Sequence, residues 1–347
     1  MIDINPRRAF LFSVAVFLFI LAIQAMEEGA SDLGYTLKYA FNLDNPLNTL
    51  GFGWLSASLI LSGSPIAASA LAFFDSGVLT ELEAFAMLNG ARFGVSFAIL
   101  LIGFIYHMRG HERHTSISLG ILTLLVTYTI YLGAILIGIF ILRYDLLDFL
   151  QFGIPAFLTS TIDVFFNPIV DFLAEKLGSW LVFLFGLAII IASFKLFDGA
   201  LPKVKLKETR FKETSRYIYR PWVMFSLGFI LTMITPSVSI SLGLLVPLSV
   251  RGYIKVENLV PYIMGANIST FSDTLVIAIL LANPSAFTIV LAEIVGIAVV
   301  SAVVLAFFFH AYERFILDSL LIISRSNRNL AAFLIATFLV PIGLLLI

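Results

Sequence analysis

The stretch Leu61-Ser62-Gly63-Ser64-Pro65 interrupts an apolar run that covers about residues 48–78. A second interrupted run, about 222–251, contains Pro236-Ser237-Val238-Ser239. Small, hydroxyl and proline residues in the middle of an apolar run favour a break in a helix. A broken backbone at membrane depth is stable only where protein or a water-filled cavity satisfies its polar groups. The two stretches therefore predict two broken helices and a functional site beside them.

The composition of the chain indicates that lipid is its solvent. Hydrophobic residues make up 60% of the 347 residues and charged residues 12%, whereas soluble domains carry roughly 25% charged residues. The net charge of −1 argues against a nucleic-acid partner, and the absence of cysteine excludes thiol or iron–sulfur chemistry. Arg7 and Arg8 precede the first apolar run without a small-residue cleavage site after it, so we expect an uncleaved first helix.

Seven other segments are long and apolar enough to cross a bilayer, which takes about 20 apolar residues of helix. They are about 9–26, 82–106, 118–143, 178–198, 254–282, 286–309 and 328–347. These spans predict an all-α polytopic membrane protein.

Charge in the connections predicts the orientation, because basic loops remain on the cytoplasmic side. The basic connections are 107–114, 195–220 and 310–328, and the acidic ones are 27–47 and 144–177. All basic connections fall on one side only if each interrupted run enters and leaves on the same side. We therefore expect two re-entrant hairpins, at 48–78 from outside and at 222–251 from inside. The N-terminus is then cytoplasmic, and the C-terminus lies outside the cell membrane.

The two halves of the chain match when one is shifted by 175 residues. The matched positions are Gly53 with Gly228, Ser62 with Ser237, Ser64 with Ser239, Gly77 with Gly252, and Gly90-Ala91 with Gly265-Ala266. Because the two hairpins enter from opposite sides, the halves are predicted to be inverted repeats, 1–177 and 178–347. Interrupted segments at matching places in two inverted repeats are typical of a transporter with a site at the membrane midplane.

The residues at these places suit ions. N–H groups at the N-termini of half-helices favour an anion, whereas hydroxyl oxygens and freed carbonyls suit a hard cation such as Na⁺. The candidate substrate-binding residues are Ser62, Ser64, Arg92, Ser237 and Ser239. The candidate ion-binding residues are Asn267, Ser269, Thr270, Ser272 and Asp273.

Three charged residues within the predicted spans have two interpretations each. A charge at the bilayer centre costs roughly 2.5–3.5 kcal/mol on insertion scales, so such residues are commonly functional. Arg92 is interpreted as holding an anion or replacing a coupling Na⁺, or else as pairing with Asp273 or Glu293. Asp273 is interpreted as a Na⁺ ligand or proton carrier, or as the neutralising partner of Arg92. Glu293 is interpreted as an ion relay or as a structural hydrogen bond between helices.

These motifs resemble the type II sodium–phosphate symporters. That family carries Gln-Ser-Ser-Ser in each hairpin and Gly-Ala/Ser-Asn-Ile-Gly-Thr downstream, and Gly265-Ala266-Asn267-Ile268 is the closest match. The resemblance covers about 48–106 and 222–282 and implies symport of phosphate or a related small anion with Na⁺, without another cofactor. The chain departs from the family pattern, because Leu61 and Pro236 replace the glutamines and Arg92 replaces the first asparagine.

Other classes of function remain as alternatives. The chain has no G-x-x-x-x-G-K-[ST], G-x-S-x-G or H-E-x-x-H motif, so we expect neither an ATP-driven pump nor an enzyme. The first alternative is a membrane enzyme that acts on lipid-linked phosphate, which phosphate release would identify. The second is a channel or a non-transporting regulator on the same scaffold. Transport that depends on a Na⁺ gradient would separate the symporter from both.

Overall fold

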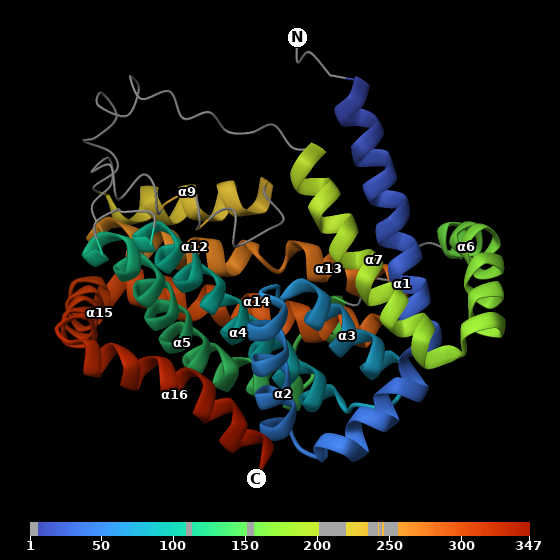
Figure 1. The fold of residues 1–347 in the computed structure, drawn as a ribbon, viewed down its shortest axis with the longest axis horizontal. Coiled ribbons are helices and arrows are strands. Elements are labelled where there is room, and N and C mark those ends of the chain that lie inside the picture. The colour runs from blue at the N-terminus through green and yellow to red at the C-terminus, as the bar shows by residue number, and fades with distance from the viewer. Residues whose placement is uncertain are drawn as a thin grey trace.

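The computed structural model describes residues 6–108, 113–150, 156–200, 220–234 and 256–347, together with Leu242 and Leu245. Every regular element within these residues is helical (Figure 1). In chain order they are α1 (Pro6–Phe41), α2 (Pro46–Ile60), α3 (Ser64–Asp75), α4 (Glu81–Met108), α5 (Arg113–Arg143), η1 (Asp148–Leu150), α6 (Ala156–Leu177), α7 (Ser179–Ala200), α9 (Pro221–Ile234), η2 (Val256–Asn258), α12 (Leu259–Ser269), α13 (Ser272–Leu280), α14 (Pro284–Val303), the π-helical η3 (Val304–Phe308), α15 (Phe309–Ser324) and α16 (Asn327–Leu345).

The described residues contain seven helical stretches that are long and apolar enough to cross a membrane. They are Pro6–Phe41, Glu81–Ile105, Ile117–Arg143, Ser179–Ala200, Val256–Leu280, Pro284–Ser324 and Asn327–Leu345. Each overlaps one predicted span, so the prediction of an all-helical protein with seven such helices is confirmed. The helices do not share one axis, because α1 and α7 run steeply in Figure 1 while α14 runs across the view.

The first interrupted run forms two helices with a short break between them. Asn45 caps α2, since its Oδ1 accepts hydrogen bonds from the backbone N–H groups of Leu47 and Asn48 at 2.9 and 3.0 Å. α2 ends at Leu61, whose φ of 57° places a bulky residue in the left-handed region. α3 then starts at Ser64, so the helix breaks where the sequence predicts.

The predicted span 254–282 corresponds to the apolar stretch Val256–Leu280, which has an interruption that the sequence analysis does not predict. Thr270 and Phe271 separate α12 from α13. The Asp273 carboxylate accepts the backbone N–H of Thr274 at 2.6 Å and its hydroxyl at 3.0 Å. A side chain that bonds neighbouring backbone in this way competes with the regular helix pattern.

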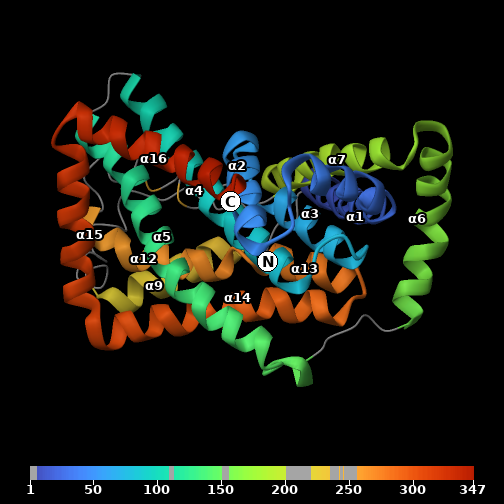
Figure 2. The same ribbon diagram turned by 90° about the horizontal axis from the view of Figure 1, so that it is seen from below.

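Three connections are largely helical although the sequence analysis predicts no helix there. α1 continues to Phe41 through most of the acidic connection 27–47, α6 lies in the acidic connection 144–177, and α15 occupies most of the basic connection 310–328. α15 follows α14 through η3, and Figure 2 shows it turned across the end of α14. Ile316 and Leu320, one helical turn apart, are buried on α15. This spacing gives α15 one apolar face, which explains why a segment with charged residues is helical.

Two pairs of helices cross at glycines. At each crossing, a Cβ atom added to either of two glycines would lie under 3.0 Å from a backbone carbonyl oxygen of the partner helix. Where α2 crosses α4, Gly53 faces the carbonyl oxygen of Met87 and Gly90 faces that of Leu50. Where α9 crosses α12, Gly228 faces the carbonyl oxygen of Tyr262 and Gly265 faces that of Phe225. Real Cβ atoms essentially never approach that closely. Glycine is therefore needed at these crossings because the backbones touch.

The buried centre of the protein lies where α4, α5, α12 and α14 meet. α5 packs against α4, α12 and α14, and α14 also contacts α4 and α12. α1 and α7 lie side by side and contact this centre partly through α3. Arg92 of α4 and Glu293 of α14 are almost completely buried, so two ionisable side chains lie inside the apolar core.

Candidate functional site

The two described helix breaks meet at one carboxylate. Ser64, the first residue of α3, donates a hydrogen bond from its hydroxyl to Asp273 Oδ2. Asp273 itself lies in the first turn of α13. The N-terminus of a helix carries a partial positive charge and unpaired N–H groups, which stabilise a nearby anion. The carboxylate therefore lies near the N-termini of two half-helices.

Arg92 of α4 completes this cluster from the other side. Its Nη2 lies 3.5 Å from Asp273 Oδ1 and donates a hydrogen bond to Thr274 Oγ1 at 2.6 Å. The guanidinium also stacks over the ring of Phe271, 4.2 Å from the ring centroid. The side chains of Arg92 and Asp273 are 2% and 5% exposed, so the pair is shielded from solvent. Asp273 therefore neutralises Arg92 in this conformation. The sequence analysis gave this pairing as the alternative to anion binding by Arg92.

Asn267 and its neighbours on α12 contact other groups. The Asn267 side chain pairs with the hydroxyl of Thr127 on α5 at 3.3 and 3.4 Å. Ser269 donates to carbonyl oxygens within its own helix, which is a structural bond. The hydroxyl of Thr270 is buried without a hydrogen-bond partner among the described residues. The structure thus divides the candidate ion-binding residues between α12, where Asn267 contacts α5, and α13, where Asp273 contacts Arg92.

The sequence reading did not identify Asn89, which lies one residue before the Gly90-Ala91 motif. Its side-chain amide donates to Glu293 Oε2 at 2.5 Å and to the backbone oxygen of Phe85 at 3.0 Å. Asn89 and Glu293 are both fully buried. Asparagine in the middle of a predicted apolar span was the signal available in the sequence. This pair joins α4 to α14 as the Arg92–Asp273 pair joins α4 to α13.

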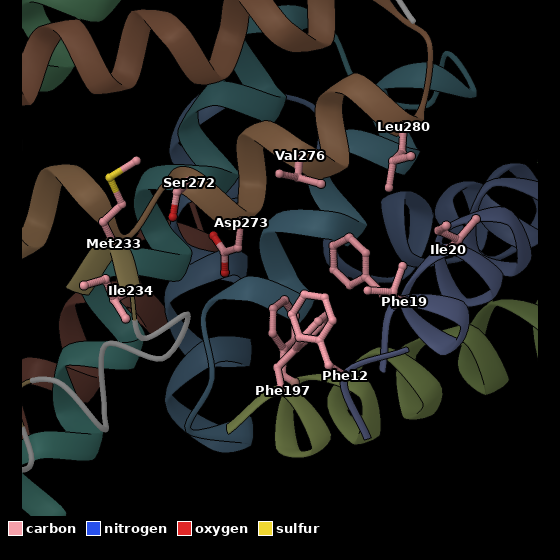
Figure 3. A pocket seen from close by; sticks show the side chains of 12 residues that line it. Phe12, Phe19, Ile20, Phe197, Met233, Ile234, Ser272, Asp273, Val276 and Leu280 are labelled. Carbon is pink, nitrogen blue, oxygen red and sulfur yellow. The ribbon is translucent and has the colours of Figure 1, made fainter. Parts of the chain in front are cut away.

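An apolar groove reaches Asp273 from the side of α1 and α7. Its volume is about 450 Å³, and α1, α7, α9 and α13 line it. Ser272 and Asp273 are the polar side chains of its lining, which otherwise consists of residues such as Phe12, Phe197 and Ile234. Figure 3 shows the Asp273 carboxylate directed toward the space between Ile234 and the two phenylalanine rings. Asp273 is therefore the member of the buried pair that faces an accessible space.

The remaining candidates fall on the hairpins. Ser62 is half-buried in the break between α2 and α3. Ser237 and Ser239, with half of the predicted hairpin 222–251, lie outside the described residues. Within the described part of the chain, no three His, Asp or Glu side chains come together to hold a metal ion.

Comparisons of the chain with protein-family models, with curated proteins and with solved structures each found no match.

Proposed function

We propose that this protein is a secondary active transporter that carries inorganic phosphate or a related small anion together with Na⁺. The observation that supports this most is the meeting of two broken helices at the buried Arg92–Asp273 pair. Irregular backbone at membrane depth occurs where it lines a site, and ionisable residues there mark ion and substrate paths. The resemblance to the type II sodium–phosphate symporters supplies the substrate and the coupling ion of the proposal.

The proposal includes two inverted repeats, each with a re-entrant hairpin. The glycine crossings support the repeats, because Gly53 and Gly228, and likewise Gly90 and Gly265, differ by 175 positions and make equivalent contacts. The helix pair α2 and α3 supports the first hairpin, since the two helices diverge from one break (Figure 1). The start of α1 and the end of α16 lie at opposite ends of the molecule, which accords with a cytoplasmic N-terminus and an external C-terminus.

The ion pair suggests how anion and cation binding are coupled. An anion that takes Arg92 must displace Asp273, and a cation that takes Asp273 must displace Arg92. Either event alone leaves an unpaired charge in the protein interior, which is costly. Binding both ions together restores neutrality at both residues. Exchange of partners within one ion pair would therefore make transport of the two ions interdependent.

The test is uptake of radiolabelled phosphate into proteoliposomes, with and without an inward Na⁺ gradient. We expect uptake only with the gradient, and loss of that uptake in Asp273→Asn. Asp318→Asn is the matched control, because Asp318 is exposed on α15 and should leave uptake unchanged. If folded wild-type protein takes up no phosphate under either condition, phosphate is not the substrate.

Arg92→Asn tests the idea that Arg92 stands in for a coupling cation. This substitution introduces the residue that the resembling family has at this position. We expect phosphate uptake to depend more steeply on the Na⁺ concentration than in the wild type, because an additional Na⁺ would be required. Unchanged Na⁺ dependence in a variant that still transports would exclude this role of Arg92.

A further inference from the structure

The strongest feature not used by the proposed exchange is the buried pair of Asn89 and Glu293. Glu293 is 0% exposed and accepts one hydrogen bond, from Asn89 Nδ2 to Oε2 at 2.5 Å. Its other oxygen, Oε1, is buried without a hydrogen-bond partner among the described residues, and so is Oδ1 of Asn89. Two acceptor oxygens without a donor in an apolar core are costly and require an explanation.

One proton accounts for both orphan oxygens. A carboxylic acid has an O–H that donates, whereas a carboxylate only accepts. Asn89 and Glu293 already share one hydrogen bond, so a proton on Glu293 Oε1 can supply a second one, to Asn89 Oδ1. The orientation of the Asn89 amide is well defined, because its nitrogen donates to two acceptors, Glu293 Oε2 and the Phe85 carbonyl oxygen. We propose that Glu293 is a proton-binding site, held as a carboxylic acid by Asn89.

The charges around Glu293 agree with this assignment. Arg92 is the buried cation among the described residues, and it is already paired with Asp273. The phenol of Tyr131 on α5 is also buried, and it donates a hydrogen bond to the backbone oxygen of Asn267 at 3.3 Å. Besides η3, which continues it, the elements packed against α14 are α3, α4, α5, α12, α13 and η1. Apart from Arg92 and Asp273, the Asp, Glu and Arg side chains that the structure places on them are Asp75, Glu81, Glu83 and Arg143 in end turns and the exposed Asp148 in η1. Among the described residues, the one guanidinium and two carboxyl groups of this centre are thus electrically neutral only when one carboxyl carries a proton.

A metal ion fits this place less well than a proton. Hard cations in proteins are surrounded by many oxygen ligands, six to eight in the case of calcium. Asn89 Oδ1 and Glu293 Oε1 offer two, and the amide nitrogen of Asn89 occupies the side of Glu293 Oε2. A proton needs only one donor oxygen and one acceptor oxygen, which this pair supplies.

The role of this proton in transport rests on the proposed function. If Glu293 loses the proton, its carboxylate competes with Asp273 for Arg92, whose Nε is buried without a partner among the described residues. Asp273 would then be freed to bind a cation from the groove. The proton on Glu293 therefore favours the paired state of Arg92 and Asp273, and its release favours the state in which Asp273 accepts the cation.

Infrared spectroscopy of the protein in lipid nanodiscs tests the proton directly. We expect a carbonyl stretching band of a protonated carboxylic acid that shifts in D₂O and disappears in Glu293→Gln. Glutamine should preserve the fold, because its amide can accept from and donate to Asn89. Glu83→Gln is the control: Glu83 lies 3.8 Å from Lys38 and accepts from the backbone N–H of Thr80, so it should not contribute to the band. An identical band in the wild type and in Glu293→Gln overturns the proposal.

Phosphate uptake at different external pH then tests the coupling. We expect the initial rate in the wild type to rise severalfold from acidic to alkaline medium at a fixed Na⁺ gradient, and the rise to be much smaller in Glu293→Gln. A variant that keeps the wild-type pH dependence would exclude Glu293 as the coupling group. If the wild type transports nothing, the proposed function fails, while the infrared measurement still decides whether Glu293 binds the proton.

Discussion

Ser64 and Asp273 are joined by a hydrogen bond although 209 positions separate them in the chain. Each residue lies in the first turn of a helix that follows a break, Ser64 in α3 and Asp273 in α13. Arg92 contacts the same carboxylate from α4. Asp273 is thus held by contacts from α3 and from α4. Its substitution should therefore change both the stability of the fold and the binding of ions.

Removing the carboxylate should destabilise the protein through Arg92. Asp273→Asn keeps a side chain that can accept from Ser64 but leaves the Arg92 guanidinium buried without a counter-charge. Breaking one partner of a buried pair costs about 3–5 kcal/mol. We expect a clearly lower midpoint of thermal unfolding in detergent for Asp273→Asn and recovery of most of the loss in Arg92→Met/Asp273→Asn. Unfolding of the single variant at the wild-type temperature would show that the pair does not stabilise the fold.

The glycine crossings should be intolerant of a single methyl group. In Gly90→Ala and Gly265→Ala the new Cβ would meet a carbonyl oxygen of α2 or α9, and backbone cannot move aside as a side chain can. Overpacking of this kind typically costs about 1–3 kcal/mol. Gly199→Ala in α7 is the matched control, since no atom lies within 4 Å of its added Cβ. We expect lower unfolding midpoints for the first two variants only, and equal midpoints for all three would contradict the crossing geometry.

The absence of cysteine makes membrane sidedness directly measurable. Asp44 and Thr80 flank the α2–α3 pair and are exposed. If that pair is a re-entrant hairpin from outside, Asp44→Cys and Thr80→Cys should both react with a membrane-impermeant maleimide added to intact cells. Arg325→Cys, in a predicted cytoplasmic connection, should react only after permeabilisation. Labelling of Asp44→Cys and Thr80→Cys from opposite sides would exclude the hairpin.

Leu61 should tolerate glycine better than its neighbour Leu59 does. Leu61 has a φ of 57°, a conformation that costs a side chain roughly 1–2 kcal/mol and glycine almost nothing. Leu59 lies inside α2, where glycine costs about 1 kcal/mol. We therefore expect Leu61→Gly to unfold at a higher temperature than Leu59→Gly, measured under the same detergent conditions. The reverse order would show that packing of the Leu61 side chain stabilises the protein by more than the left-handed backbone conformation of Leu61 destabilises it.

Much of the helical framework could be predicted because hydrophobic length alone indicates a membrane span. The break at Leu61-Ser62-Gly63 was visible because glycine and proline stand beside it. The break at Thr270 and Phe271 was not, since neither residue is a strong helix breaker and the local cause is the Asp273 side chain. α15 was missed because charged residues such as Arg314 and Asp318 alternate there with its apolar face.

The candidate site could be predicted only in part, for a physical reason. Buried charge is costly, so Arg92, Asp273 and Glu293 were conspicuous in apolar segments. Their partners depend on packing between distant segments, which a pattern along one chain does not contain. The contacts of Asn89 with Glu293 and of Ser64 with Asp273 span 204 and 209 positions. The role of Asn89 in particular cannot be predicted from the sequence, because its partner Glu293 lies on α14 and meets it only when α14 packs against α4.

The glycine crossings also limit how the protein can move. Where α2 touches α4 and α9 touches α12, backbone lies against backbone, and neither helix has a side chain there over which its partner could slide. Packed interfaces of this kind resist gradual deformation. We therefore expect each pair of helices to move as one rigid body, with hinges at the short breaks Leu61–Gly63 and Thr270–Phe271. Ser64 and Asp273 lie beside those hinges, whereas Arg92 lies on α4 within the first pair. A small rotation at the hinges would therefore pull the Arg92–Asp273 ion pair apart without unpacking either pair of helices.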